Sequence, residues 1–131
     1  MQSKGDILVV DDDAPIAQFI IEALQDEGYT AREAANASEA LAALAATIPD
    51  LILLDLLMPG MSGSELLAYL RTHGHAEVPV VIMTADTKAA QLLAAQEAPR
   101  CLIKPFTLDA LLDCVARAIR TNGNSKNSSA A

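Results

Sequence analysis

The sequence contains a small set of polar residues that end or directly follow short apolar runs. They are four acids, one hydroxyl and one amine, namely Asp11, Asp12, Asp13, Asp55, Thr84 and Lys104. Clustered carboxylates repel one another and need a counter-cation, and oxygen ligands completed by water suit Mg²⁺. An ammonium group opposite the ion can neutralise a phosphoryl group in transfer, and an aspartate between the two can accept it as an aspartyl-phosphate. These residue types therefore allow magnesium-assisted phosphoryl transfer.

The polar residues can meet only if the fold brings the ends of several strands together. Short runs of strand-favouring residues predict five strands, at Ile7–Val10, Tyr29–Ala34, Leu51–Leu54, Val80–Met83 and Cys101–Ile103, of which Tyr29–Ala34 is the weakest. Several of these runs are apolar at every position, which is typical of strands covered on both faces.

Segments with a helical period separate the strands. The first stripe consists of Ile16, Phe19, Ile20, Ala23 and Leu24, and Gly28 is the expected stop after it. Similar stripes run through 66–70 and 108–119, and the Ala-rich segments 38–46 and 87–96 are helical by propensity. The sequence thus predicts five helices.

Alternating strands and helices predict a parallel sheet with right-handed crossovers and helices on both faces. The periodicity leaves two strand orders open, the flavodoxin-like 2-1-3-4-5 and a half-Rossmann arrangement. In either order the carboxyl ends of the strands share one edge, where ligands bind. We expect one domain over residues 5–120, and from Thr121 onward, where no period remains, a disordered tail or truncated linker.

Composition narrows the possible partners and compartment. Acids outnumber bases by 17 to 9, which gives a net charge of −8 and disfavours contact with nucleic acid or anionic membranes. We find no secretory signal or membrane-spanning run. Cys101 and Cys114 have no metal-binding spacing, so we expect small core thiols in a cytoplasmic protein.

Four sequence blocks resemble the signature blocks of the bacterial response-regulator receiver family. They are ILVVDDDAP, LILLDLLMPGMSG, VPVVIMTAD and LIKPF, and they occur in the family's order and spacing between about Asp6 and Arg120. The resemblance implies an α/β, flavodoxin-like five-stranded sheet of order 2-1-3-4-5, which resolves the choice left open above. It also implies a phosphoacceptor domain of a two-component phosphorelay.

The same resemblance assigns metal ligands and a phosphoacceptor. Asp11 and Asp12 match the acid pair that holds Mg²⁺, and Asp55 matches the phosphoacceptor, which is also a metal ligand. The backbone carbonyl of Leu57 matches the third protein ligand of the ion. Asp13, followed by Pro15, is expected to cap the first helix instead.

Three further positions match the switch machinery of the family. Thr84 matches the hydroxyl that follows the phosphoryl group, and Lys104 matches the lysine that pairs with it. Pro105 matches a proline that is preceded by a cis peptide. The implied phosphodonor is a sensor histidine kinase or a histidine phosphotransfer protein, and the implied output surface, through which receivers can form homodimers, lies on the fourth helix, fifth strand and fifth helix.

The sequence departs from the family at the position three residues before Lys104. The family usually carries Tyr, Phe or His there, and this chain carries Cys101. A small thiol cannot report the switch by burying a ring, so we expect backbone shifts between Thr84 and Gln96 to carry the signal. We also expect Asp86, rather than Leu57, to hydrogen-bond the water that removes the phosphoryl group.

The expected function is a signalling switch rather than an enzyme. One alternative is a haloacid-dehalogenase-like phosphatase, because Asp11 and Asp13 form an Asp-x-Asp pair after an apolar strand. Such enzymes need a later acid on a strand and usually a cap over the substrate, but only Asp109 and Asp113, both in the last predicted helix, follow Lys104. A second alternative is a receiver-like interaction scaffold that is not phosphorylated.

Overall fold

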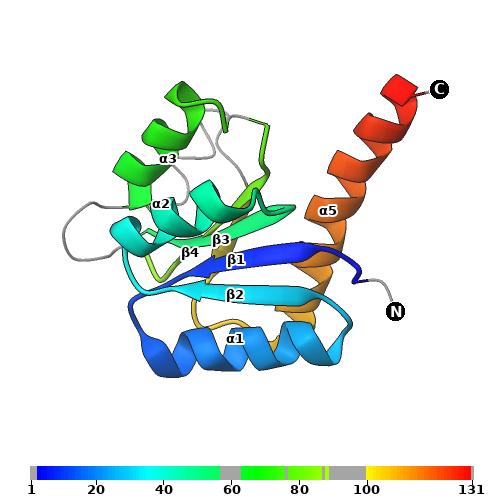
Figure 1. Ribbon diagram of the computed structural model, residues 1–131. Helices are drawn as coiled ribbons and strands as arrows, with labels where there is room; N and C mark the ends of the chain where they lie inside the picture. The colour runs from blue at the N-terminus through cyan, green and yellow to red at the C-terminus, as the bar shows by residue number, and fades with distance from the viewer. Residues whose placement is uncertain (1–2, 57–62, 76, 87, 89–99, 131) are drawn as a thin grey trace.

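The protein is a parallel sheet with helices on both faces (Figure 1). The computed structural model describes residues 3–56, 63–75, 77–86, 88 and 100–130. In chain order, the elements are β1 (Asp6–Val10), α1 (Ala14–Asp26), β2 (Thr30–Ala34), α2 (Ala37–Ala46), β3 (Leu51–Asp55), α3 (Gly63–Thr72), β4 (Val80–Thr84), β5 (Arg100–Ile103) and α5 (Leu108–Ala130). The helix predicted over residues 87–96 falls largely outside the described residues.

The strand order is β2-β1-β3-β4-β5, and every pair of neighbouring strands is parallel. This order confirms the flavodoxin-like prediction. β3 and β4 are buried at all five positions, because both of their faces are covered. Strand β5 forms one edge of the sheet beside β4, and Thr84 lies opposite Ile103 in their register.

Alternate residues of the strands point to opposite faces of the sheet and pack into two separate cores. One core packs β-strand residues against α1 and α5 and includes Ile7, Leu53 and Val115. The other packs the opposite face against α2 and α3 and includes Leu54 and Leu66. Both cores are almost entirely aliphatic, in agreement with an aromatic content of 3%, and together they hold the sheet rigid beneath its carboxyl edge.

Helix α1 begins and ends as its sequence predicts. The carboxylate of Asp13 accepts a hydrogen bond from the N–H of Ile16 at 3.2 Å, so Asp13 is the N-cap. Gly28 follows the helix with φ +105°, a conformation that favours glycine. Phe19 departs from the predicted buried stripe because 47% of its surface is exposed.

The C-terminal segment differs from the expectation. The backbone of α5 is helical as far as Ala130 and extends beyond the sheet (Figure 1), whereas the sequence predicts no regular structure from Thr121. Residues 121–130 contain no proline. The backbone hydrogen bonds of the helix can therefore continue from its packed part into this segment, although the segment has no apolar stripe. The domain boundary at residue 120 stays a prediction.

The capping of α2 gives a test of local stability. The side chain of Asn36 accepts a hydrogen bond from the N–H of Glu39 at 2.8 Å. We expect Asn36→Ala to lower the free energy of unfolding by about 1 kcal/mol, because this N–H loses its partner. Asn36→Asp keeps an acceptor and is the matched control. Urea unfolding checks both variants, and equal stability of Asn36→Ala and the parent would contradict the assignment.

Candidate functional site

The carboxyl ends of four strands bring the predicted polar residues together. Asp11 directly follows β1, Asp55 and Thr84 end β3 and β4, and Lys104 directly follows β5. The N–H of Lys104 donates to the carbonyl of Thr84 at 2.8 Å, which continues the β4–β5 pairing to the site. Parallel register therefore sets these side chains at one edge.

Asp11 is wholly buried, and both of its carboxylate oxygens are engaged. The N–H of Asp13 donates to Oδ1 at 2.9 Å, and the ammonium of Lys104 donates to Oδ2 at 3.0 Å. The N–H of Asp11 donates in turn to the carbonyl of Ala34 at the end of β2, at 3.1 Å. A buried carboxylate needs such compensation because it has lost its water.

Lys104 lies between two carboxylates. Its Nζ atom is 3.0 Å from Asp11 Oδ2 and 3.7 Å from Asp55 Oδ1, and only 18% of its side chain is exposed. Asp55 is itself 7% exposed. The ammonium therefore sits in a poorly hydrated position from which it can neutralise negative charge that develops on or beside Asp55.

Three carboxylates form a cluster that suits a divalent cation. One oxygen from each of Asp11, Asp12 and Asp55 lies within 4.8 Å of the others. Asp12 is exposed, and among the described residues its carboxylate has no hydrogen-bond partner. An oxygen-only donor set with space for water fits Mg²⁺. Leu57, whose carbonyl was predicted as a further ligand, lies outside the described residues.

The hydroxyl of Thr84 is almost fully buried, with 1% of the residue exposed. Its oxygen accepts a hydrogen bond from the N–H of Asp86 at 3.0 Å, so the hydroxyl proton can be donated to another group. The carboxylate of Asp86 accepts from the N–H of Lys88 at 3.0 Å. Thr84 is thus connected directly to the backbone of the segment that follows β4.

The peptide between Lys104 and Pro105 is cis, as the resemblance implies. Cys101, three residues before Lys104, is half-buried and packs against the core under α2 and α3. Burial raises the pKa of the Cys101 thiol above its usual value. The thiol is therefore a weak nucleophile near neutral pH, and Cys101 and Cys114 form no disulfide in the described part of the chain.

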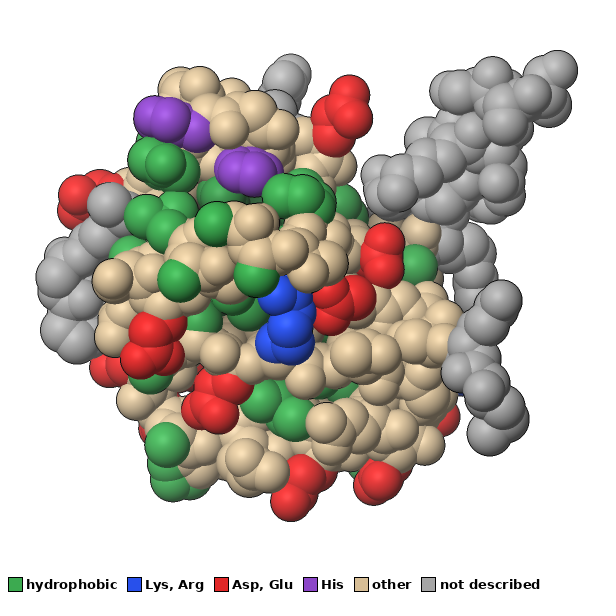
Figure 2. Space-filling view, in the orientation of Figure 1, with side chains coloured by type: hydrophobic (Ala, Val, Ile, Leu, Met, Phe, Trp, Pro, Cys, Tyr) green, Lys and Arg blue, Asp and Glu red, His purple; other side chains and the backbone are tan. Residues whose placement is uncertain are grey.

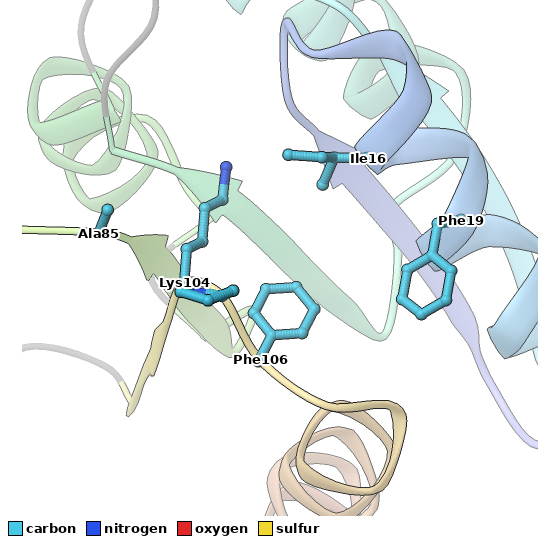
Figure 3. A pocket seen from close by; sticks show the side chains of 6 residues that line it. Ile16, Phe19, Ala85, Lys104 and Phe106 are labelled. Atoms are coloured by element: carbon cyan, nitrogen blue, oxygen red, sulfur yellow. The ribbon is translucent and has the colours of Figure 1, made fainter.

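An apolar cavity that the sequence does not predict lies beside the site. It has a volume of about 360 Å³ and is lined by Ile16, Phe19, Ala85, Lys104, Pro105 and Phe106. In Figure 3 the ring of Phe106 lies between Lys104 and Phe19, and the nitrogen of Lys104 points away from that ring. Both phenylalanines of the chain line this cavity. In the sequence, only the Pro105–Phe106 pair after Lys104 could have suggested this cavity.

Known proteins resemble this chain along most of its length. The family model described as response regulator receiver domain matches residues 7–116. The DNA-binding transcriptional regulator NtrC of Salmonella typhimurium is 42% identical over 118 residues, which is 88% of this chain and 25% of NtrC. The DNA-binding response regulator MtrA of Mycolicibacterium paratuberculosis is 36% identical, and the match covers 88% of this chain and 52% of MtrA.

A solved structure agrees with both the fold and the extent of the match. The crystal structure of the receiver domain of NtrX from Brucella abortus has a TM-score of 0.82 at 35% identity, covering 88% of this chain and 99% of that one. The chain thus spans a quarter to a half of the length of the NtrC and MtrA relatives but nearly all of an isolated receiver. The family match, the strand order and the acidic edge agree, and the chain belongs to the response regulator receiver domain family.

Proposed function

We propose that Asp55 accepts a phosphoryl group from a phosphohistidine of a sensor kinase or phosphotransfer protein, and that this modification switches a partner or output domain. The position of the Asp55 carboxylate, between the acid cluster and the Lys104 ammonium, carries the proposal. An oxygen of Asp55 bonds to phosphorus as the bond from phosphorus to the histidine nitrogen breaks, and the electron pair stays on that nitrogen. The chain promotes only this transfer and the later loss of phosphate to water.

The side chains around Asp55 have different roles in the proposed transfer. Asp11, Asp12 and Asp55 would supply the negative charge that holds Mg²⁺, with the carbonyl of Leu57 as a further predicted ligand. The ion, when bound, neutralises phosphoryl oxygens. Lys104 neutralises charge from the other side, as its 3.7 Å distance to Asp55 Oδ1 supports.

The switch step is assigned to Thr84. Its hydroxyl turns to donate to a phosphoryl oxygen on Asp55, which changes the hydrogen bond that the N–H of Asp86 now makes to it. The backbone after β4 therefore receives the signal directly. The family usually carries an aromatic ring at the position of Cys101, and a small thiol cannot move inward as a ring does. The backbone after Thr84 is therefore proposed to carry the signal instead.

The geometry disfavours the phosphatase alternative. In that reading Asp11 would be the nucleophile and Asp13 the acid, but both oxygens of Asp11 are engaged and Asp13 caps α1. Asp109, which follows Lys104 in sequence, lies in the first turn of α5 rather than on a strand. Assigning Asp55 as the phosphoacceptor gives a role to each buried polar side chain among the described residues of this edge, Asp11, Asp55 and Thr84.

We further propose that this chain binds protein partners and makes no nucleic-acid contact of its own. NtrC and MtrA are named as DNA-binding regulators, but the net charge of this chain is −8, and acidic side chains are spread over the face shown in Figure 2. Among the described residues, no helix has both the length and the apolar character needed to cross a bilayer. A cytoplasmic location is proposed, because the spacing of the two cysteines in the sequence suits neither a disulfide framework nor a metal site.

The output surface is proposed to lie on the fourth helix, β5 and α5, where a homodimer can also form. Ile103 at the end of β5 and Leu108 at the start of α5 are 38% and 44% exposed. Exposed aliphatic side chains on two adjoining elements suit a protein contact. The predicted fourth helix lies largely outside the described residues.

Incubation with Mg²⁺ and acetyl phosphate, followed by intact mass, tests the phosphoacceptor. We expect one added phosphoryl group in the parent and none in Asp55→Asn, because the nucleophile is lost. Asp109→Asn removes one exposed acid outside the site and is the matched control, which should be modified like the parent. An unmodified parent would favour an interaction scaffold, and sustained turnover of phosphate esters would favour the phosphatase.

The route of the switch can be followed by the amide signal of Asp86. With the phosphoryl mimic beryllofluoride, we expect this amide to shift strongly, because its acceptor Thr84 Oγ1 changes partner. In Thr84→Val, which lacks the hydroxyl at similar volume, the Asp86 shift should be much smaller. NMR spectra of both proteins, with and without beryllofluoride, give these shifts. If the amide signals after Thr84 do not move in the parent, the backbone route is wrong.

The lifetime of the phosphorylated state should depend on Asp86. A carboxylate two residues beyond Thr84 can hydrogen-bond an attacking water, whereas the side chain of Leu57 cannot. We expect Asp86→Ala to slow dephosphorylation several-fold, by roughly the effect of one lost water-positioning contact, and Leu57→Ala to change it less. Phosphate release from the two variants is measured side by side. A larger effect at Leu57 would contradict the assignment.

A further inference from the structure

Helix α3 carries a pair of rings that are held in place at its C-terminal end. The rings of Tyr69 and His73 are stacked, with their centroids 3.8 Å apart and their planes 9° from parallel. His73 Nδ1 lies 2.9 Å from the carbonyl oxygen of Tyr69 and 2.9 Å from the hydroxyl of Thr72. Because a carbonyl oxygen can only accept, Nδ1 carries the proton, and this hydrogen bond fixes the His73 ring against Tyr69.

The way α3 ends keeps this ring pair at the surface. Gly74 follows with φ +88°, and the N–H of His75 donates to the carbonyl of Leu70 at 3.0 Å, a pairing that closes a helix after a left-handed glycine. His73 is exposed and Tyr69 is half-buried. Figure 2 shows histidine beside hydrophobic side chains over the region that α3 occupies in Figure 1.

An acid shares this side of α3 with the two rings. Glu65 is exposed and lies one turn before Tyr69, and residues four apart are neighbours on a helix surface. Arg71, the only base in the sequence of α3, lies about 200° around the helix from Tyr69. The row from Glu65 to His73 therefore presents a carboxylate beside a fixed aromatic ring. In a chain of net charge −8, such a row suits a cationic group.

We propose that the row formed by Glu65, Tyr69 and His73 binds an arginine side chain of a protein partner. A guanidinium is planar, so it can lie on an aromatic face and donate to a carboxylate at the same time. His73 covers one face of the Tyr69 ring, and the opposite face is assigned to the guanidinium. A carboxylate has about four acceptor positions, so Glu65 can accept from it. The proposal does not depend on phosphorylation of Asp55.

The fixed rings explain why arginine is preferred over lysine. An aromatic ring that is already held in position loses little conformational entropy when a partner binds. Stacking on such a ring favours a flat, weakly hydrated guanidinium over a compact, strongly hydrated ammonium. The carboxylate alone would attract both cations, so the difference between them reports on the Tyr69 ring.

Two short peptides test the proposal, acetyl-Gly-Arg-Gly-amide and the same peptide with lysine in place of arginine. Each is titrated into the protein at about 0.15 M salt, which screens general attraction to acidic side chains, without Mg²⁺ or a phosphodonor. By NMR we expect the largest amide shifts along α3, around Tyr69 and His73. The arginine peptide should bind about threefold more tightly than the lysine peptide, with NOEs between its methylenes and the Tyr69 ring.

Three variants separate the ring from the charge. Tyr69→Leu keeps apolar bulk without an aromatic face, and it should bind the two peptides equally. Glu65→Gln should weaken both peptides, because the carboxylate is lost, while the preference for arginine remains. Asp109→Asn removes an exposed acid from the first turn of α5. It is the matched control for Glu65→Gln and should change neither affinity.

Several outcomes would overturn the proposal. Shifts spread over the acidic surface, or equal affinities of the parent for the two peptides, would mean that general charge attraction or apolar contact is enough. A preference for arginine that survives in Tyr69→Leu would exclude the ring. If Tyr69→Leu does not fold, the NOEs of the parent and the affinities of Glu65→Gln still decide. A parent that accepts no phosphoryl group on Asp55 would leave this test unaffected.

Discussion

The ion pair between Lys104 and Asp11 is the contact on which the rest of the site depends. Asp11 is wholly buried, and a buried carboxylate is tolerated only where charge or hydrogen bonds replace its lost water. Lys104 and the N–H of Asp13 supply that replacement. Breaking a buried pair from one side typically costs about 3–5 kcal/mol, so the pair also ties the segment after β5 to the end of β1.

The sequence was enough to predict most of this edge, because the site is built from strand ends. Apolar runs located most of the strands, and the polar residues at their carboxyl ends are Asp11, Asp55, Thr84 and Lys104. The cap role of Asp13 followed from the proline two residues later. Strand order needed the family resemblance, because periodicity describes faces and not neighbours.

Other features could not be predicted, for identifiable physical reasons. The helical period placed Phe19 on the same face as buried residues. Whether it is buried, however, depends on the residues that lie opposite it, and there Phe19 and Phe106 line an open cavity instead of filling it. The continuation of α5 to Ala130 follows from helix propagation without an apolar stripe. The pairing of Lys104 with Asp11 at 3.0 Å, shorter than its 3.7 Å approach to Asp55, depends on side-chain geometry that no motif encodes.

The separation of 93 residues between Lys104 and Asp11 along the chain has a consequence for biosynthesis. Contacts between distant residues form late, because the loop between them must close first. A chain still emerging from the ribosome has β1 and its acids long before it has Lys104. The nascent protein therefore lacks the contact between Lys104 and Asp11 until its fifth strand docks.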